Sequence, residues 1–252
     1  MSTNVINANK VHKFFICRHG ETDANESGVI QGSSDFSSLT MKGKEQARNL
    51  GLSLSHAVAM NHVFLSPLNR AQETWDILRE AMIENNNGGA EIYQREIVLN
   101  NLREIDFYSW EGLDKNEIKA RFPTSYQAWK SGDPEVLSVE AESEEIKYPL
   151  KDLWDRASEV WNEIHEHELN YLLQSKMTTE HSSSSLLVCH GSLGQALLGS
   201  ALGADANFFR KEEFPNCGVV EIEWVLHSKE SFGKVHRWRW YRPTVGEWNY
   251  HK

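Results

Sequence analysis

Three short runs of consecutive apolar residues constrain the fold of this chain more than any other feature of its sequence. They are Phe14–Cys17, Val63–Leu65 and Leu186–Cys189, and each is followed by polar or glycine residues and then by residues at helical spacing. Continuous apolar runs indicate strands buried on both faces, as in a parallel sheet. Strands that alternate with helices predict an α/β fold. We expect a three-layer sandwich, with a mostly parallel central sheet and helices on both faces.

The segments that follow these runs carry the signals of covering helices, namely a capping residue and apolar side chains at helical spacing. Four helices are expected: from Thr40 to Leu54, from Ser66-Pro67 to about Met82, from about Leu150 to Gln174, and from Ser192 to Gly203. Residues 218–224 and 234–241 alternate as strands do, and we expect them to finish one edge of the sheet. The stretches 131–147, which is acidic, and 182–185, which is serine-rich, have loop composition.

The length of the chain allows one large domain or two small ones. Its 252 residues are 40% hydrophobic and 25% charged, which is enough apolar surface for a sizeable core. No break in composition is long enough to force a domain boundary. We therefore expect a single domain over residues 1–252, with an inserted loop or lid region around residues 105–148.

Charge and apolar content exclude several kinds of partner. A formal net charge of -10 repels a polyphosphate backbone, so we expect no nucleic acid partner, although a small anion can still bind where Arg and His converge. No window reaches the ~18 apolar residues of a membrane span, and residues 1–13 lack the apolar core of a signal peptide. We expect no membrane partner and a cytoplasmic location, or a plastid one if a transit segment has been removed. The oligomeric state is open, with a homodimer as one alternative.

The three cysteines, Cys17, Cys189 and Cys217, are too few and too scattered for a disulfide scaffold and fit a reducing compartment. Cys17 and Cys189 each directly precede a predicted catalytic motif. One hypothesis is therefore a redox-sensitive pair beside the site. The alternative, two small buried core residues, is favoured because cysteine is commonly buried and inert.

Two histidines and two arginines follow the expected strands. Arg18 and His19 come directly after the first strand, His190 directly after the third, and Arg70 lies in the first turn of the helix after the second. Open α/β sheets bind ligands at the carboxyl ends of their strands, so we expect these side chains to converge. Guanidinium groups bind phosphate oxygens, one neutral imidazole can attack phosphorus, and a second, protonated one can stabilise the transferring group. The pattern predicts a phosphoryl-transfer site without a metal.

Such a site needs a proton donor for the departing oxygen. Glu104 follows the apolar stretch 97–99 and stands beside an aromatic cluster, where a carboxyl shielded from water could hold a proton. Glu21, Asp106 and Glu111 are nearby rivals for the same role.

His165 and His167 suggest a metal site at first sight. Alternate residues on a helix point ~200° apart, so the two cannot share one metal ion. We expect residues 164–168 to form a solvated helix face, and we expect no metal and no other cofactor.

The motifs around these residues resemble those of the histidine phosphatase superfamily, the phosphoglycerate mutase-like fold, from about Phe14 to Trp224. The matching motifs are RHGET with Asn25, the Ser-Pro-Leu-x-Arg-Ala-x-x-Thr block from Ser66 to Thr74, Leu-x-Glu followed by Trp110-Glu111-Gly112, and His190-Gly191. The resemblance implies that His19 is the phosphorylated nucleophile and Glu104 the general acid. It implies phosphate or substrate contacts from Arg18, Asn25, Gln31, Gly32, Arg70, His190, Gly191 and Ser192.

Within the superfamily, residues 28–40, 102–117 and 194–219 are similar to plant and algal 2-carboxyarabinitol-1-phosphate phosphatase-like proteins. The chain departs from their pattern at Gly191, where we expect Asn, and at Trp110-Glu111, and it shows no plastid transit segment.

The predicted function is a metal-independent phosphatase that hydrolyses a small phosphorylated metabolite, a sugar phosphate or a phosphorylated sugar acid, through a phosphohistidine on His19. A phosphoglycerate mutase is the alternative, but Arg103 and Arg121 are isolated, whereas those enzymes carry paired arginines after the acid. A module that binds phosphorylated ligands without turnover is a third hypothesis. It is disfavoured because no catalytic His or Arg is missing.

Overall fold

The computed structural model describes residues 10–55, 60–85, 93–141, 143–174, 183–211, 214–226, 235–244 and 247–251. Within these residues the main sheet has seven strands in the order β3-β2-β6-β1-β7-β8-β9. Four strands are parallel: β1 (Lys10–Arg18), β2 (Met60–Leu65), β3 (Tyr93–Val98) and β6 (Ser183–Cys189). Three strands continue the sheet in antiparallel fashion: β7 (Val219–Leu226), β8 (Val235–Thr244) and β9 (Glu247–His251).

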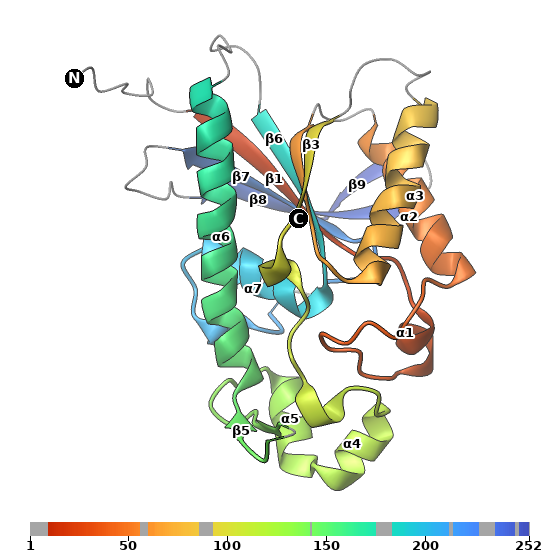
Figure 1. Ribbon diagram of the computed structural model, residues 1–252, viewed down its shortest axis with the longest axis vertical. Coiled ribbons are helices and arrows are strands. Elements are labelled where there is room, and N and C mark those ends of the chain that lie inside the picture. Colours follow the sequence, from red (N-terminus) through yellow and green to blue (C-terminus); the bar gives the residue numbers. More distant parts are fainter. Residues whose placement is uncertain are drawn as a thin grey trace, which may run out of the picture.

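Helices cover both faces of this sheet (Figure 1). α2 (Met41–Leu54) and α3 (Asn69–Asn85) lie on one face, and α6 (Pro149–Gln174) and α7 (Gly191–Ala201) lie on the other. Side chains alternate across a strand, so Phe15 of β1 packs toward α2 and α3 while Phe14 packs toward α6 and α7. The expected three-layer α/β sandwich is confirmed. None of the helices in the described part of the chain combines the length and apolar character that crossing a membrane needs.

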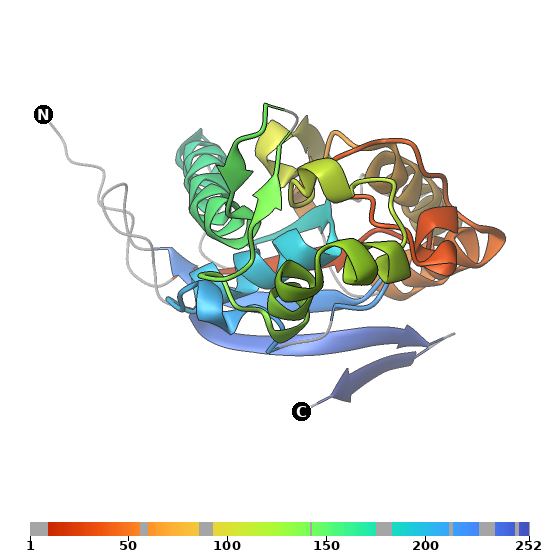
Figure 2. The ribbon, with the colours of Figure 1, turned by 90° about the horizontal axis from the view of Figure 1, so that it is seen from below.

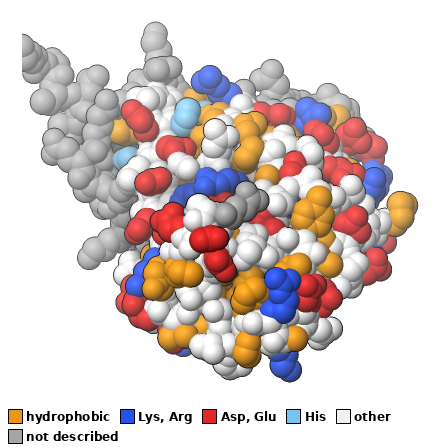
Figure 3. Space-filling view, turned by 60° about the horizontal axis from the view of Figure 1, so that its bottom comes forward, with side chains coloured by type: hydrophobic (Ala, Val, Ile, Leu, Met, Phe, Trp, Pro, Cys, Tyr) orange, Lys and Arg blue, Asp and Glu red, His pale blue; other side chains and the backbone are white. Residues whose placement is uncertain are grey.

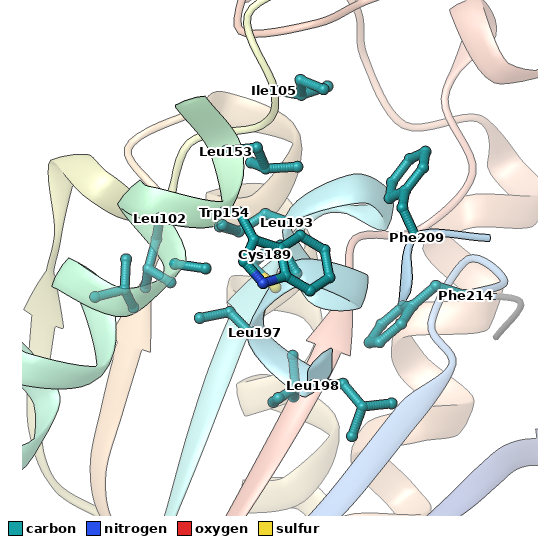
Figure 4. Close-up of a cluster of buried hydrophobic side chains, with 14 of the residues drawn as sticks. Leu102, Ile105, Leu153, Trp154, Cys189, Leu193, Leu197, Leu198, Phe209 and Phe214 are labelled. Carbon is teal, nitrogen blue, oxygen red and sulfur yellow. The ribbon is translucent and has the colours of Figure 1, made fainter. Parts of the chain in front are cut away.

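α7 is held on all sides by the core (Figure 4). Leu193, Leu197 and Leu198 are fully buried, and Trp161 of α6 donates a hydrogen bond from its indole N–H to the Leu197 carbonyl at 3.0 Å. The Trp154 indole N–H likewise donates to the carbonyl of Ala204 just beyond the helix, at 2.9 Å. The N-terminal end of α7 therefore points in a fixed direction.

Residues 105–148 form a small layer beside the carboxyl ends of the parallel strands, at the bottom of Figure 1 and in front of the sheet in Figure 2. The layer contains η2 (Tyr108–Trp110), α4 (Lys115–Arg121), α5 (Pro123–Ser131), and the short strands β4 (Val139–Glu140) and β5 (Ile146–Lys147). Its Phe107, Trp110 and Trp129 rings belong to the same buried cluster as the inner sides of α6 and α7. The remaining elements are α1 (Asp23–Ser27), η1 (Asn100–Leu102) and η3 (Ala206–Phe208).

Several expected boundaries were wrong. Residues 183–185 belong to β6, not to a loop, because they pair with β1 and because the buried Ser185 hydroxyl donates to Glu168. β8 is not the sheet edge, since β9 pairs with it there (Figure 2). α3 begins at Asn69, later than expected, and α7 begins at Gly191 and ends at Ala201. The expected cap at Thr40 is confirmed, because its side chain accepts from the Gly43 N–H.

Two glycines let α2 touch the loop that follows β1. A Cβ on Gly20 would lie 2.5 Å from the carbonyl oxygen of Gly43, and a Cβ on Gly43 would lie 2.0 Å from the carbonyl oxygen of Glu21. Neither position has room for a side chain. The backbone directly after His19 therefore rests on the first turn of α2.

Candidate active site

The predicted residues converge on one cleft of about 410 Å³ at the carboxyl ends of the parallel strands. Its wall includes Arg18, His19, Asn25, Gln31, Gly32, Arg70, Glu104, Gly191 and Ser192. His190 is fully buried behind this wall, with its ring centroid 5.2 Å from that of His19. All the residues expected to catalyse or to bind phosphate therefore lie in this wall or directly against it.

His19 is arranged as a neutral imidazole. Its Nδ1 lies 2.7 Å from the Gly20 carbonyl oxygen, which can only accept, so Nδ1 carries the proton and Nε2 keeps its lone pair. Burial lowers the pKa of His19 well below its ordinary value, and the positive charges of Arg18 and Arg70 lower it further. A neutral imidazole with a free Nε2 is the form that can attack phosphorus.

Arg18 and Arg70 are fixed by backbone carbonyls. Arg18 donates from Nη1 to Phe214 at 2.8 Å, and Arg70 donates to Ser34 at 2.9 Å and to Gly32 at 2.7 Å. The Nε–H of each is buried with no hydrogen-bond partner in the structure. Burial lowers both pKa values, but from so high a starting point that the guanidinium groups stay charged at neutral pH. Two buried cations with unused donors are suited to an anion such as phosphate.

His190 is fixed by Ser66. Its Nε2 lies 2.7 Å from the Ser66 hydroxyl oxygen, which also accepts the Leu68 N–H at 3.3 Å. The Ser66 hydroxyl can donate its proton to Nε2, and the imidazole proton then lies on Nδ1, a buried atom with no partner among the described residues.

The second imidazole, expected to be protonated while it stabilises the transferring group, is not favoured in that form in the free protein. Burial lowers the pKa of His190 well below its ordinary value, and the positive charges of Arg70 and Arg18 add to the effect. The free protein therefore holds His190 neutral, as a single N–H donor.

Glu104 follows η1 and binds the N-terminus of α7. Its Oε2 accepts the Ser192 N–H at 3.0 Å, and its Oε1 accepts the N–H groups of Leu193 at 3.0 Å and Ile105 at 2.9 Å. The carboxyl therefore lies among N–H donors at the positive end of a helix, rather than in the aromatic shelter that the sequence suggested.

The rival acids have other partners. Glu21 and Asp106 form ion pairs with Lys42 at 2.6 Å and with Arg103 at 3.1 Å. Glu111 accepts backbone N–H groups of residues 33–34 and so shapes the loop that carries Gly32. None of the three lines the cleft, and among the described residues Glu104 is the acid in its wall.

Sequence reasoning missed two residues that hold the site in place. The Asn216 amide donates to the His19 carbonyl and to the Asn25 side-chain oxygen, both at 3.1 Å. Arg156 of α6 is buried and donates to the Glu104 carbonyl at 2.9 Å. Asn216 lies in the 194–219 segment that the resemblance singled out, whereas nothing in the spacing of α6 distinguishes Arg156.

The redox hypothesis is wrong for this structure. Cys17 and Cys189 lie on neighbouring strands but on opposite faces of the sheet. Cys17 packs toward α2 and α3, whereas Cys189 packs toward α6 and α7, as Figure 4 shows for Cys189. Both are fully buried, and burial raises the pKa of each thiol. All three cysteines are free.

A second polar cluster lies at the opposite ends of the strands. The buried Glu168 carboxylate is 2.9 Å from His62 Nδ1 and accepts the Ser185 hydroxyl, which lies 3.1 Å from His12 Nε2. The expected solvated face at residues 164–168 is thus only partly present, because Glu168 turns inward. Within the described ranges, no three His, Cys, Asp or Glu residues are placed to hold a metal ion.

Comparisons with known proteins match this architecture. A family model described as "Histidine phosphatase superfamily (branch 1)" matches residues 14–238. The chain is 34% identical over 211 residues to a probable 2-carboxy-D-arabinitol-1-phosphatase of Arabidopsis thaliana and 34% identical over 214 residues to a 2-carboxy-D-arabinitol-1-phosphatase of Triticum aestivum. Each alignment covers 83% of this chain but 37% and 36% of those proteins, so the chain spans little more than a third of their length.

A mycobacterial glucosyl-3-phosphoglycerate phosphatase has a similar structure. Its TM-score is 0.70 at 24% identity, and the superposition covers 92% of this chain and 97% of that one. At this identity the likeness shows a shared fold.

Proposed function

The chain belongs to the histidine phosphatase superfamily, and from this membership and the geometry of the cleft we propose that it is a metal-independent phosphoric monoester hydrolase. Its substrate is a small phosphorylated metabolite, a sugar phosphate or a phosphorylated sugar acid, and His19 carries the phosphoryl group between two steps. One observation carries the proposal. Three buried donors without partners, on Arg18, Arg70 and His190, surround an imidazole whose Nε2 is free.

In the first step, the phosphate oxygens accept the unused N–H groups of Arg18, Arg70 and His190. The Nε2 of His19 attacks phosphorus, a P–N bond forms, and the bond from phosphorus to the ester oxygen breaks. Glu104 gives that oxygen its proton, so an alcohol leaves.

In the second step, Glu104 is a carboxylate and takes a proton from water as the water oxygen attacks phosphorus. The P–N bond breaks, inorganic phosphate forms and His19 is restored. Both steps use the same donors, because the transferring group lies between the same two arginines throughout.

The two relatives that are 34% identical to the chain support a phosphatase rather than a mutase, since both are named as phosphatases, whereas relatives named as probable phosphoglycerate mutases are 25% to 27% identical. A cytoplasmic location is also part of the proposal. It is supported by three free, buried cysteines, which suit a reducing compartment.

The test is to trap the intermediate. We expect the enzyme, mixed with a ³²P-labelled phosphate ester and quenched in alkali, to hold label that acid removes. His19→Ala should abolish the label and the release of phosphate, while His165→Ala, a histidine change on α6 outside the cleft, should alter neither. Activity should survive EDTA.

Other outcomes would contradict the proposal. Label on His190 would show that His190, and not His19, is the nucleophile. Isomerisation of 3-phosphoglycerate without release of phosphate would indicate a mutase, and binding of phosphate without any turnover would indicate a ligand-binding module.

A further inference from the structure

Three basic side chains form the outer wall of the cleft: Lys115 at the start of α4, Lys130 in α5, and Arg210 after η3. Lys115 and Arg210 lie within segments 102–117 and 194–219 that the resemblance singled out, but no motif gave any of the three a role, because three separate elements contribute them. The proposed phosphoryl transfer, which uses Arg18, Arg70 and His190, has no role for them.

These cations lack carboxylate partners. Elsewhere on the described surface, lysines and arginines commonly form ion pairs, as Arg121 does with Glu117 at 2.9 Å and Lys151 with Glu135 at 2.7 Å. Among the described residues, Lys115, Lys130 and Arg210 form no ion pair. Figure 3 shows acidic and basic side chains interspersed over the face that contains α4 and α5.

The arginine of this group is held in place. Its guanidinium carbon lies 4.7 Å from the centroid of the Trp129 ring, and its backbone N–H donates to the Gln195 side chain at 2.8 Å. Arg210 has a φ of 66°, a left-handed conformation that a bulky residue adopts only where its surroundings hold it. Gly132 makes room for it, since a Cβ there would lie 2.6 Å from the Phe209 carbonyl oxygen. A cation fixed in this way binds an anion with little loss of side-chain entropy.

The three charges face one space. Burial lowers the pKa of Lys115, and the charges of Lys130, Arg18 and Arg210 lower it further, which places the outer cations near one another and near the phosphate site. Arg210 also lies within reach of the charge of Glu104, but among the described residues no ion pair offsets the repulsion between the three cations, and a ligand with negative charge at this end of the cleft would relieve it.

We propose that Lys115, Lys130 and Arg210 bind a second anionic group of the substrate. The substrates are then small phosphate monoesters whose carbon skeleton carries a further carboxylate or phosphate. The skeleton lies against Phe107 and Trp129, which line the cleft between the two groups of cations. This inference rests on the proposed phosphatase function and narrows its substrate class.

The experiment compares pairs of esters that differ in the second charge. 3-Phosphoglycerate differs from glycerol 3-phosphate by a carboxylate, and fructose 1,6-bisphosphate differs from fructose 6-phosphate by a phosphate. We expect kcat/KM to be at least about tenfold higher for the doubly anionic member of one pair. Arg210→Met should reduce that ratio by about tenfold to 100-fold, which is the effect of losing a charge-assisted hydrogen bond.

Controls separate this effect from a general loss of positive charge. Arg121→Met removes the same charge from α4 outside the cleft and should leave the ratio as in the wild type. If Arg210→Met does not fold, Lys130→Met tests the same anion site. Equal kcat/KM within both pairs, or equal losses for both members in the Arg210 and Lys130 variants, would overturn the inference.

Failure of the proposed phosphatase function can be distinguished from failure of the second anion site. If no ester releases phosphate, calorimetry on the His19→Ala variant still compares the Kd of 3-phosphoglycerate with that of glycerol 3-phosphate. The second anion site is supported if His19→Ala binds 3-phosphoglycerate more tightly than glycerol 3-phosphate and a His19→Ala, Arg210→Met double variant loses this preference. Equal Kd values for the two esters in His19→Ala refute it.

Discussion

The Ser66 hydroxyl oxygen lies 2.7 Å from Nε2 of His190, and a hydroxyl that donates there keeps the imidazole proton on Nδ1. Ser66→Ala removes the donor that keeps the proton on Nδ1, so the tautomer that serves a phosphate oxygen loses population. We expect kcat to fall by about tenfold or more, comparable to the loss of one buried hydrogen bond at a reacting group, with a smaller change in KM. Steady-state kinetics measure this. Ser66→Thr keeps the hydroxyl and should recover most of kcat; equal damage from both variants would show that only packing matters.

His19 should remain neutral at pH values well below its ordinary pKa, because burial and the charges of Arg18 and Arg70 all disfavour its protonated form. Removing a nearby positive charge makes protonation easier, so Arg18→Met should raise the pKa of His19. Nitrogen chemical shifts of labelled histidine, followed as the pH is lowered, measure both values in the free enzyme. An imidazole of His19 that titrates at its ordinary pKa in the wild type would contradict this account.

The acid role of Glu104 predicts a dependence on the leaving group. Glu104→Gln should slow the hydrolysis of alkyl phosphates by about 100-fold or more, and that of p-nitrophenyl phosphate much less, because nitrophenolate leaves without a proton. Glu111→Gln is the matched control, since Glu111 holds the adjacent loop from outside the cleft wall. Its effect should be the same for both substrates. Equal losses from Glu104→Gln would assign Glu104 to positioning alone.

Stability should fall in mildly acidic solution because of His12. Burial lowers its pKa from 6.5 to about 4, so below pH 6.5 the unfolded chain binds a proton that the folded chain excludes. The free energy of unfolding therefore decreases as the pH falls from 6.5 toward 4. Between pH 7 and pH 5 this group contributes a loss of about 2 kcal/mol. Urea unfolding at pH 7 and at pH 5 gives the fall in the free energy of unfolding between the two pH values. This fall should be smaller by that amount in His12→Gln than in the wild type. The same fall in both proteins would show that His12 does not contribute.

The cysteines should be unreactive in the folded protein, because all three are fully buried and free. An aromatic disulfide reagent should modify none of them until denaturant is added, and dilute peroxide should leave activity unchanged over the same period. Rapid reaction of any thiol in the native protein would mean that the sheet opens locally on that timescale.

The sequence alone was sufficient to predict that the phosphate-binding residues of the cleft lie together. Arg18, His19 and His190 follow apolar strands directly, and the order of a parallel sheet brings such positions together whatever the loops do. Arg70 follows from the first turn of the next helix by the same reasoning.

The outer wall of the cleft, the protonation state of His190 and the buried position of Glu168 could not be predicted in this way. Lys115, Lys130 and Arg210 meet only because α4, α5 and the loop after η3 pack together, which is a tertiary contact with no local signal. The neutral state of His190 depends on burial beside two guanidinium groups. Glu168 was assigned to solvent because its neighbours are polar, whereas its partners His12, His62 and Ser185 lie on three different strands.

The contact between Gly20 and Gly43 determines which parts of this enzyme can change over evolutionary time. The loop that carries His19 is braced backbone against backbone by this contact, which no side chain of α2 can replace. Core residues of β1 and α2 can be exchanged for others of similar size while the nucleophile stays in register with the arginines. In a library of random variants that retain phosphatase activity, the two glycines should be nearly invariant, while the cleft wall at Lys115, Lys130 and Arg210 should accept replacements that redirect the enzyme to new esters.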